Sequence, residues 1–329
     1  MKRRLVEPFV LALLLTVLLA WLVPYPGTKQ SPFHLDEIAG VGVSIIFLLY
    51  GIQLGPEKLK SGLTNMRLHL LVHLSTFVLF PLVIILLKPL FVTVFLQKVW
   101  LPFFFLAVLP STVSSSVVMV SLAEGNVPGA IFNASISSLL GIFITPLWMS
   151  FFMQHQASGF HLADITGKLM LQVLLPVTAG LLLHGRLGSY AASVKKQLKL
   201  FDQFIILLIV YCSFCDSFSS GIFNGFGPVY LLAMLLMVTA LLFIAYGAIW
   251  LVSRLLHLNR EDSITALFCG SKKSLVHGSV MSKVLFTGPA GTGLVLLPLM
   301  MYHAVQLFII SIIAGRMRRK HQQALTGHA

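Results

Sequence analysis

Two adjacent lysines, Lys272 and Lys273, stand in the middle of an apolar segment that runs from about residue 263 to residue 286. The centre of this segment reads Cys-Gly-Ser-Lys-Lys-Ser-Leu. One lysine at the centre of a membrane helix costs about 2.5–3.5 kcal/mol, so the pair costs roughly 5–7 kcal/mol, which rivals the stability of many folded domains. We therefore expect the lysines to be buried in a polar cavity, or the helix to be broken around them. Both arrangements indicate a site within the membrane.

Three kinds of chemistry are open to these lysines, and they are not exclusive. The first is binding of an organic anion, with help from the N-termini of half-helices, which favour negative charge. The second is uptake of a proton during transport by a neutral, desolvated lysine. The third is structural, because lysines can cap the C-terminal carbonyl groups of half-helices and hold a crossing shut. The 10 acidic residues all fall at the ends of apolar segments or between them, so none is an evident partner within the membrane.

A second polar cluster lies inside another apolar segment, where the chain reads Leu-Pro-Ser-Thr-Val-Ser-Ser-Ser from Leu109 to Ser116. Pro110 removes a helical hydrogen bond, and the hydroxyl groups compete with the backbone for hydrogen bonds. A second interrupted helix is therefore expected here, and it must line a protein or water cavity because unpaired backbone cannot face lipid. The alternative is that these small residues form a packing face between helices.

The next segment places Asn133, Ser137 and Gly141 at i, i+4 and i+8, either facing the same cavity or packing tightly on a neighbouring helix. Weaker polar candidates are Gln53, Gln172, His303 and Gln306. Such residues more often form hydrogen bonds between helices than bind a ligand. The predicted substrate- or ion-binding residues are Pro110, Ser111, Thr112, Ser114, Ser115, Ser116, Asn133, Ser137, Gly270, Ser271, Lys272, Lys273, Ser274 and His277.

The elements that must position these residues are membrane helices. The mean hydropathy is +0.93. Hydrophobic residues make up 57% of the chain and charged residues only 10%, whereas soluble proteins average about 25% charged residues. Continuously apolar runs indicate an all-α polytopic membrane protein rather than a β-barrel. Ten spans are predicted, at about 8–24, 38–55, 68–91, 100–123, 127–152, 168–184, 202–219, 228–252, 263–286 and 292–314.

The distribution of basic residues predicts the orientation of these spans. If the connections alternate from an N-terminus inside the cell, most of the 23 lysine and arginine residues fall on the inside. Both termini are therefore expected in the cytoplasm. The net charge of +13 is largely this orientation signal, and its short, scattered clusters do not favour nucleic-acid binding.

The ten spans divide into two halves of five. A polar linker at about 153–167 separates a first half, 1–152, from a second half, 168–320, followed by a cytoplasmic tail at 321–329. An odd number of spans gives the halves opposite orientations, and the polar clusters occupy the fourth span of each half. This pattern predicts an inverted repeat with a binding site at paired, interrupted helices. The longest non-apolar connection within a half, about 185–201, is expected to be a basic cytoplasmic loop.

The remaining motifs do not favour other functions. Cys212 and Cys215 have CxxC spacing but no second pair, so they are read as buried thiols, and His69 with His73 as histidines at a helix interface. The sequence has no Walker loop, dinucleotide fingerprint or zincin motif. We therefore predict no enzyme activity, no bound metal and no cofactor, with sodium or a proton as possible coupling ions.

The sequence resembles the bile acid:sodium symporter superfamily, and within it the SBF-like branch. The resemblance covers essentially the whole chain. The stretches that carry it are 109–116 (LPSTVSSS), 125–127 (GNV), 134–142 (ASISSLLGI), 268–275 (FCGSKKSL) and 297–300 (LPLM).

The resemblance implies ten helices in two inverted five-helix repeats, with helices four and nine unwound and crossing near the membrane midplane. It implies a core domain of helices 3–5 and 8–10 that moves against a panel of helices 1, 2, 6 and 7. Members of this superfamily that transport bile acids bind two sodium ions beside the crossing and an organic anion between the domains.

This chain departs from the sodium ligands that the resemblance implies. Of the serine–asparagine pair of helix four, only Ser116 remains, because Val117 takes the second position. The helix-five ligands fall near Ala130 and Ala134, although Asn133 is adjacent. The acid and amide of helix nine fall near Phe268 and Lys272. Because ammonium repels sodium, a lysine is expected to fill a space that sodium fills in the relatives.

Together these patterns predict a secondary transporter of a small organic anion in the inner membrane of a bacterium, with doubtful sodium coupling. The alternative is a membrane regulator of ion homeostasis, such as that of calcium, that carries no substrate of its own. An intramembrane enzyme is the third hypothesis, but Ser271 beside Lys272 does not have the spacing of a serine–lysine catalytic pair. The oligomeric state is not predicted.

Overall fold

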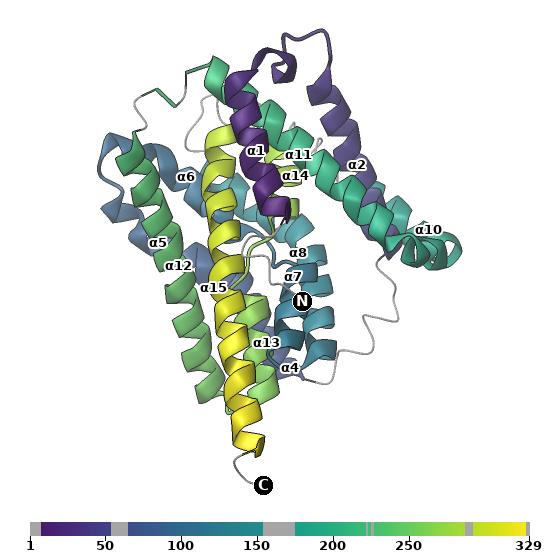
Figure 1. The fold of residues 1–329 in the computed structure, drawn as a ribbon, viewed down its shortest axis with the longest axis vertical. Coiled ribbons are helices and arrows are strands. Elements are labelled where there is room, and N and C mark those ends of the chain that lie inside the picture. The colour runs from purple at the N-terminus through teal and green to yellow at the C-terminus, as the bar shows by residue number, and fades with distance from the viewer. Residues whose placement is uncertain are drawn as a thin grey trace. The chain divides into compact units, whose positions relative to one another are not determined.

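The computed structural model describes residues 8–53, 65–153, 175–221, 223–224, 227–286 and 292–326. In these ranges the secondary structure consists of helices joined by turns and short connections (Figure 1). The predicted linker at 153–167 lies outside them apart from its first residue. The chain forms two compact units, each assembled from three separate stretches.

Unit 1 comprises Met1–Pro56, Pro146–Gly227 and Val276–Leu297. Its main helices are α1 (Pro8–Leu22), α2 (Leu35–Gln53), α10 (Leu175–Ser193), α11 (Lys195–Ser219) and most of α14 (Leu275–Leu285). Helices α2 and α10 cross at Gly51 and Gly180, where a side chain on either glycine would collide with the backbone of the other helix. Small residues at a crossing let two helix backbones approach closely, as is common in membranes.

Unit 2 comprises Glu57–Thr145, Pro228–Leu275 and Pro298–Ala329. One span runs through α4 (Met66–Leu74), the π-helical η2 (Ser75–Leu79), α5 (Phe80–Leu87) and η3 (Lys88–Leu90). The other helices of this unit alone are α6 (Val94–Val108), α7 (Ser114–Leu122), α12 (Pro228–Leu255) and α13 (Arg260–Gly270). Helix α13 packs on α4, α7 and α12.

Two long helices belong to both units. Helix α8 (Val127–Met153) passes from unit 2 to unit 1 at Pro146, and α15 (Thr292–Thr326) passes from unit 1 to unit 2 at Pro298. Each proline lies inside its helix, where it removes a backbone hydrogen bond and weakens the helix locally. The chain therefore leaves one unit for the other at the weak point of each helix.

Six of the described helical segments are long and apolar enough to cross a membrane: Leu35–Gln53, Met66–Leu90, Val127–Phe152, Lys195–Ser219, Pro228–Leu255 and Thr292–His321. Two shorter apolar helices, Leu11–Leu22 and Val94–Val108, match the first predicted span and the start of the fourth. The fourth and ninth predicted spans are each divided into two helices. The chain is thus an all-helical, multi-pass membrane protein, while the full count of ten spans stays a prediction.

Two sequence predictions are corrected by the helix boundaries. The expected loop at 185–201 is helical except at Val194, because α10 continues to Ser193 and α11 begins at Lys195. This stretch is rich in lysine, leucine and alanine, which favour helix whether or not the helix is in lipid. The fourth span was expected from residue 100, but α6 begins at Val94, where Thr93 accepts a hydrogen bond from the backbone N–H of Leu96.

At one end of unit 2, the N-termini of three helices meet at Asp262. Asn65 and Asn126 use their side-chain oxygens to cap the starts of α4 and α8, and each donates from its amide nitrogen to the Asp262 carboxylate, at 2.6 and 2.7 Å. Asn259 caps α13 by accepting from the Asp262 N–H. Asp262 is only 5% exposed, so this carboxylate locks three helices together.

Candidate functional site

The first interruption, residues 109–113, separates α6 from α7. Leu109 is extended, with φ −71° and ψ 150°, as expected for a residue that precedes proline. Pro110 has no N–H, and the next N–H, that of Ser111, donates to Ser137 Oγ at 2.9 Å. The backbone groups freed from the helix are thus captured by side chains of α8, as membrane burial requires. Thr145 Oγ1 likewise donates to the Val108 carbonyl at 2.7 Å.

The second interruption, residues 271–274, separates α13 from α14. Gly270 is the last residue of α13, and a Cβ added there would lie 3.1 Å from the Ile249 side chain. The Ser271 hydroxyl donates to the Leu267 carbonyl, while the Ser271 carbonyl accepts from Tyr302 Oη at 2.6 Å. Gln306 holds Lys273 from both sides, accepting from its N–H and donating to its carbonyl, both at 2.9 Å.

The two interruptions contact each other within unit 2. The Ser274 N–H donates to the Pro110 carbonyl at 2.9 Å. The Ser111 hydroxyl donates to the Cys269 carbonyl at 2.5 Å, and Ser116 Oγ donates to the Phe268 carbonyl at 3.3 Å. The polar clusters of the fourth and ninth predicted spans therefore form one hydrogen-bonded crossing, although they are about 160 residues apart in the sequence.

Lys273 is fully buried at 0% exposure, and its ammonium group is surrounded by backbone oxygens. Lys273 Nζ donates to the carbonyls of Thr76 at 2.7 Å, Ala107 at 2.6 Å and Leu109 at 2.9 Å. The ring centroid of Phe80 lies 4.1 Å from the same nitrogen, within range of a cation–π interaction. Three acceptors match the three N–H donors of a protonated lysine, whereas a neutral amine has two.

Lys272 is also fully buried, but its surroundings differ. Its Nζ donates to Ser115 Oγ at 3.2 Å, in the first turn of α7. Ser115 Oγ and Ser116 Oγ each lie 2.9 Å from Thr112 Oγ1, so the lysine joins a cluster of three hydroxyl groups. The N-cap residue of α7, Val113, forms no side-chain cap, and the positive end of the helix dipole points into this cluster.

The three residues predicted at i, i+4 and i+8 on α8, Asn133, Ser137 and Gly141, contact two different neighbours. Ser137 accepts from the Ser111 N–H, and Gly141 gives room to the Pro110 ring, whose Cγ would lie 2.6 Å from a Cβ added there. Asn133 instead turns to α4, where its Oδ1 lies 3.0 Å from His69 Nδ1, while its Nδ2 donates to the Gly129 carbonyl. Ser137 and Gly141 thus contact the crossing directly, and Asn133 contacts the helix beside it.

For two predicted site residues, the described structure shows no contact of the side chain with the crossing. His277 lies on α14 in unit 1, where its ring stacks on Tyr50 with centroids 5.1 Å apart. Ser114 is the first residue of α7, and its side chain is outside the described part of the chain.

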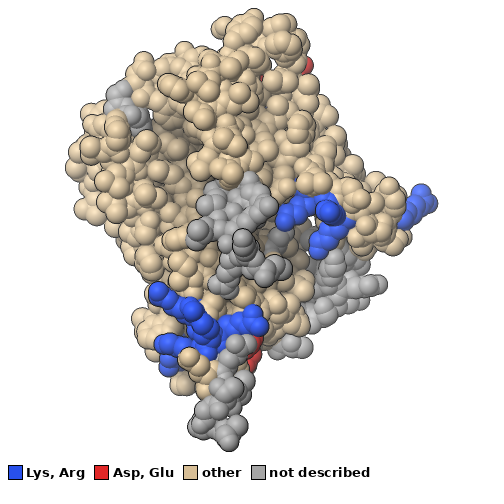
Figure 2. Space-filling view, in the orientation of Figure 1, with Lys and Arg blue, Asp and Glu red and all other residues tan. Residues whose placement is uncertain are grey.

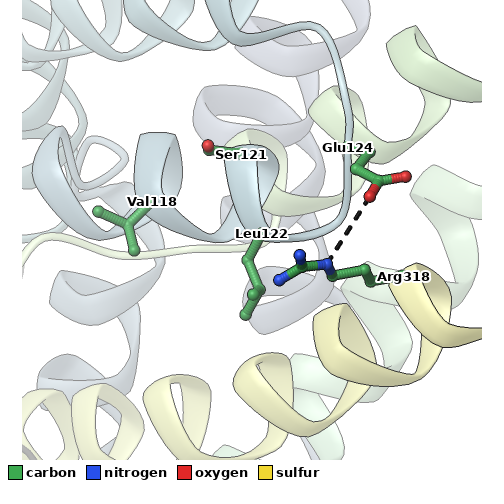
Figure 3. A pocket seen from close by; sticks show the side chains of 5 residues that line it. All are labelled: Val118, Ser121, Leu122, Glu124 and Arg318. Carbon is green, nitrogen blue, oxygen red and sulfur yellow. Dashed lines mark ion pairs between the residues drawn. The ribbon is translucent and has the colours of Figure 1, made fainter. Parts of the chain in front are cut away.

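A surface hollow of about 450 Å³ lies at the far end of α7, lined by Val118, Ser121, Leu122, Glu124 and Arg318 (Figure 3). Glu124 Oε1 lies 3.7 Å from Arg318 Nε, which ties the end of α7 to α15. Arg260 donates to the Ala123 and Glu124 carbonyls at 3.2 and 3.1 Å and so caps the same helix end. None of the predicted site residues lines this hollow, which therefore belongs to the helix terminus rather than to the crossing.

Comparison with known proteins decides the family. A model of the SBF-like CPA transporter family matches residues 7–319. The chain belongs to this family. Its relatives include an uncharacterized protein of Pseudomonas aeruginosa, 38% identical over 98% of this chain and 96% of that protein. The "Putative symporter YfeH" of Escherichia coli K12 is 38% identical over 97% of this chain and 95% of that protein. The "Sodium/bile acid cotransporter 7" of Danio rerio is 30% identical over 93% and 92%.

This membership confirms the resemblance inferred from the five sequence stretches, and it identifies the chain as a member of a transporter family. Sequence reasoning missed several residues that build the site, above all Thr76 and Phe80, which contact the Lys273 ammonium group. Pro81, directly after Phe80, is the sequence signal that could have revealed the disturbed helix at η2. Gln306 was predicted only as an interhelical hydrogen bond, and it does bond the Lys273 backbone.

Proposed function

We propose that this protein is a secondary transporter of a small organic anion in the inner membrane of a bacterium, and that Lys272 is the residue that attracts the anion. The observation that carries the proposal is the position of the Lys272 ammonium group, 3.2 Å from Ser115 Oγ in the first turn of α7. A lysine and a helix N-terminus are both positive, so placing them together favours a bound negative charge. The hydroxyls of Thr112, Ser115 and Ser116 lie beside it, and a bound anion would take hydrogen bonds that they now make to one another.

The two lysines have different roles in this proposal. Lys273 is capped by carbonyls at the C-terminal end of α6, where a cation is stabilised by the negative end of the helix. Lys272 stands at the N-terminal end of α7, where a cation is disfavoured unless an anion accompanies it. Of the uses considered for the pair, anion binding therefore fits Lys272, and the structural role fits Lys273.

Alternating access is the proposed mechanism, with the two compact units as the moving parts. Unit 2 contains most of the helices of the core domain implied by the family, and unit 1 contains those of the panel. Both interruptions lie in unit 2, so the anion would travel with this unit. The inverted repeat of ten spans and the cytoplasmic termini belong to the same proposal.

The test is uptake into proteoliposomes that contain the purified protein. Taurocholate, succinate and lactate serve as radiolabelled probes, each with external sodium or choline chloride. We expect saturable uptake of at least one probe, with rates that differ less than about twofold between sodium and choline. Matched liposomes without protein give the background. Uptake that requires sodium would contradict the predicted weak sodium dependence, and no uptake of any of the three probes would favour the regulator hypothesis.

A further inference from the structure

Three backbone oxygens surround Lys273 Nζ. The carbonyls of Thr76, Ala107 and Leu109 come from two separate helical segments and approach one nitrogen at 2.6–2.9 Å. Converging backbone carbonyls are the ligands with which membrane proteins replace the hydration shell of monovalent cations. We propose that this is a cation site that the chain keeps permanently filled with its own ammonium group, and that a small free cation takes the site once the lysine side chain is removed.

The carbonyls are available because their helical partners are missing. In η2 the Phe80 N–H donates to Ser75 in the π-helical register, and the next residue, Pro81, has no N–H to offer Thr76. The helical partner of the Ala107 carbonyl would be the N–H of Ser111, which donates to Ser137 instead. These carbonyl oxygens therefore have no helical N–H partner and accept from the lysine instead. Without the lysine or another cation they would be buried with no hydrogen-bond donor, which costs free energy.

The surroundings select a compact cation. The Phe80 ring closes one side of the site at 4.1 Å from the nitrogen, and Gln306 fixes the Lys273 backbone, so the position of the site does not depend on the side chain alone. Among the described residues, no aspartate or glutamate forms an ion pair with this nitrogen, so neutral carbonyl dipoles and one ring hold a single positive charge. Such a site matches ammonium, sodium or potassium and excludes bulky choline.

The experiment measures the melting temperature of purified Lys273→Ala protein in detergent by tryptophan fluorescence, in chloride salts of choline, sodium, potassium and ammonium. In choline we expect melting about 5–10 °C below that of the unchanged protein, because three buried carbonyls lose their donor. Ammonium should restore at least half of this loss. The unchanged protein should melt at the same temperature in all four salts. Lys272→Ala is the matched control, because Lys273 still fills the carbonyl site in this variant. The melting temperature of Lys272→Ala should therefore be the same in ammonium chloride as in choline chloride.

Two results would overturn the proposal: Lys273→Ala melting like the unchanged protein in choline, or a loss that no small cation restores. If Lys273→Ala cannot be purified in any of these salts, the pair Lys273→Gln and Lys273→Met decides. A cation site predicts that glutamine, whose amide carries two N–H donors, melts higher than methionine, which carries none. The opposite order would mean that Lys273 only fills space. The readout is stability, so the result does not depend on whether the protein transports an anion.

Discussion

At the scale of single residues, two neighbouring lysines differ in what surrounds their charges. Lys273 Nζ has three carbonyl acceptors, whereas Lys272 Nζ donates to a hydroxyl that is itself part of a polar cluster. Breaking a satisfied buried ion site costs stability, while removing a charge that is proposed to bind an anion is expected to cost function. The same substitution at adjacent positions therefore separates the two roles.

We predict that Lys272→Met weakens binding of a transported anion by about 1.5–3 kcal/mol, the scale of a charge-assisted hydrogen bond, and leaves the melting temperature unchanged or higher. Lys273→Met is the matched control, since it removes the same charge one residue away and should lower the melting temperature. The measurement is a titration of the anion that the uptake assay identifies, followed by thermal shift on both variants. Equal affinity in Lys272→Met and the unchanged protein would refute an anion site at Lys272.

The sequence predicted the interruptions but not the partners of the lysines, and the reason is physical. Pro110 and the run from Gly270 to Ser274 disturb a helix locally, so a linear pattern reveals them. A backbone carbonyl has no such signature, because every residue carries one. The choice of Thr76 as a partner follows only from the three-dimensional path of η2. His277 is near the lysines in sequence but stacks on Tyr50 in unit 1, a partner that the sequence does not reveal, and its role in a binding site stays a prediction.

At the scale of elements, the N-termini of α4, α8 and α13 are held by one carboxylate. The side-chain oxygens of Asn65 and Asn126 are already committed to capping, so both amides must present nitrogen to Asp262. A charge-assisted acceptor is therefore required at this position. The sequence predicted Asp262 only as an acid at the end of a span, because its two amide partners lie in distant connections.

We predict that Asp262→Asn lowers the free energy of unfolding by about 1.5–3 kcal/mol. The NH2 group of the new asparagine would point at the NH2 group of Asn65 or Asn126, whose oxygen is already used for capping, so at least one hydrogen bond is lost. Thermal melting of the purified variant measures the effect. Glu261→Gln is the control, because this neighbouring acid is exposed and a similar neutralisation there should change melting little. If both variants melt like the unchanged protein, Asp262 does not lock the three helices.

The prolines of α8 and α15 lie where these helices connect the two units of the molecule. Pro146 and Pro298 are the residues at which these helices pass between the units. A helix with a missing hydrogen bond bends there more readily than elsewhere. In a transporter with two moving units, such points let the connecting helices stay intact while the units rearrange.

At the scale of the whole molecule, unit 2 supplies a structural basis for the predicted orientation. Helices α4, α8 and α13 begin at the Asp262 cluster. Helices α7 and α15 end beside the same region, where Arg260 caps α7 and Arg318 meets Glu124. The basic residues at this end include Arg67, Arg254, Arg260, Arg316, Arg318, Arg319 and Lys320. Figure 2 shows lysine and arginine side chains gathered where α15 ends, and such clusters face the cytoplasm in membrane proteins.

We therefore predict that alkaline phosphatase, which is active only in the periplasm, is silent when fused after Lys320. The direction of α15 follows from its basic end, and the same reasoning places the opposite end of unit 2, where α6 begins after Thr93, in the periplasm. A fusion after Thr93 is the matched control and should be active at similar expression. Activity after Lys320 with silence after Thr93 would invert the orientation of every helix in unit 2. The Asp262 cluster and the arginine-capped end of α7 would then face the periplasm, against the charge rule that orients membrane helices.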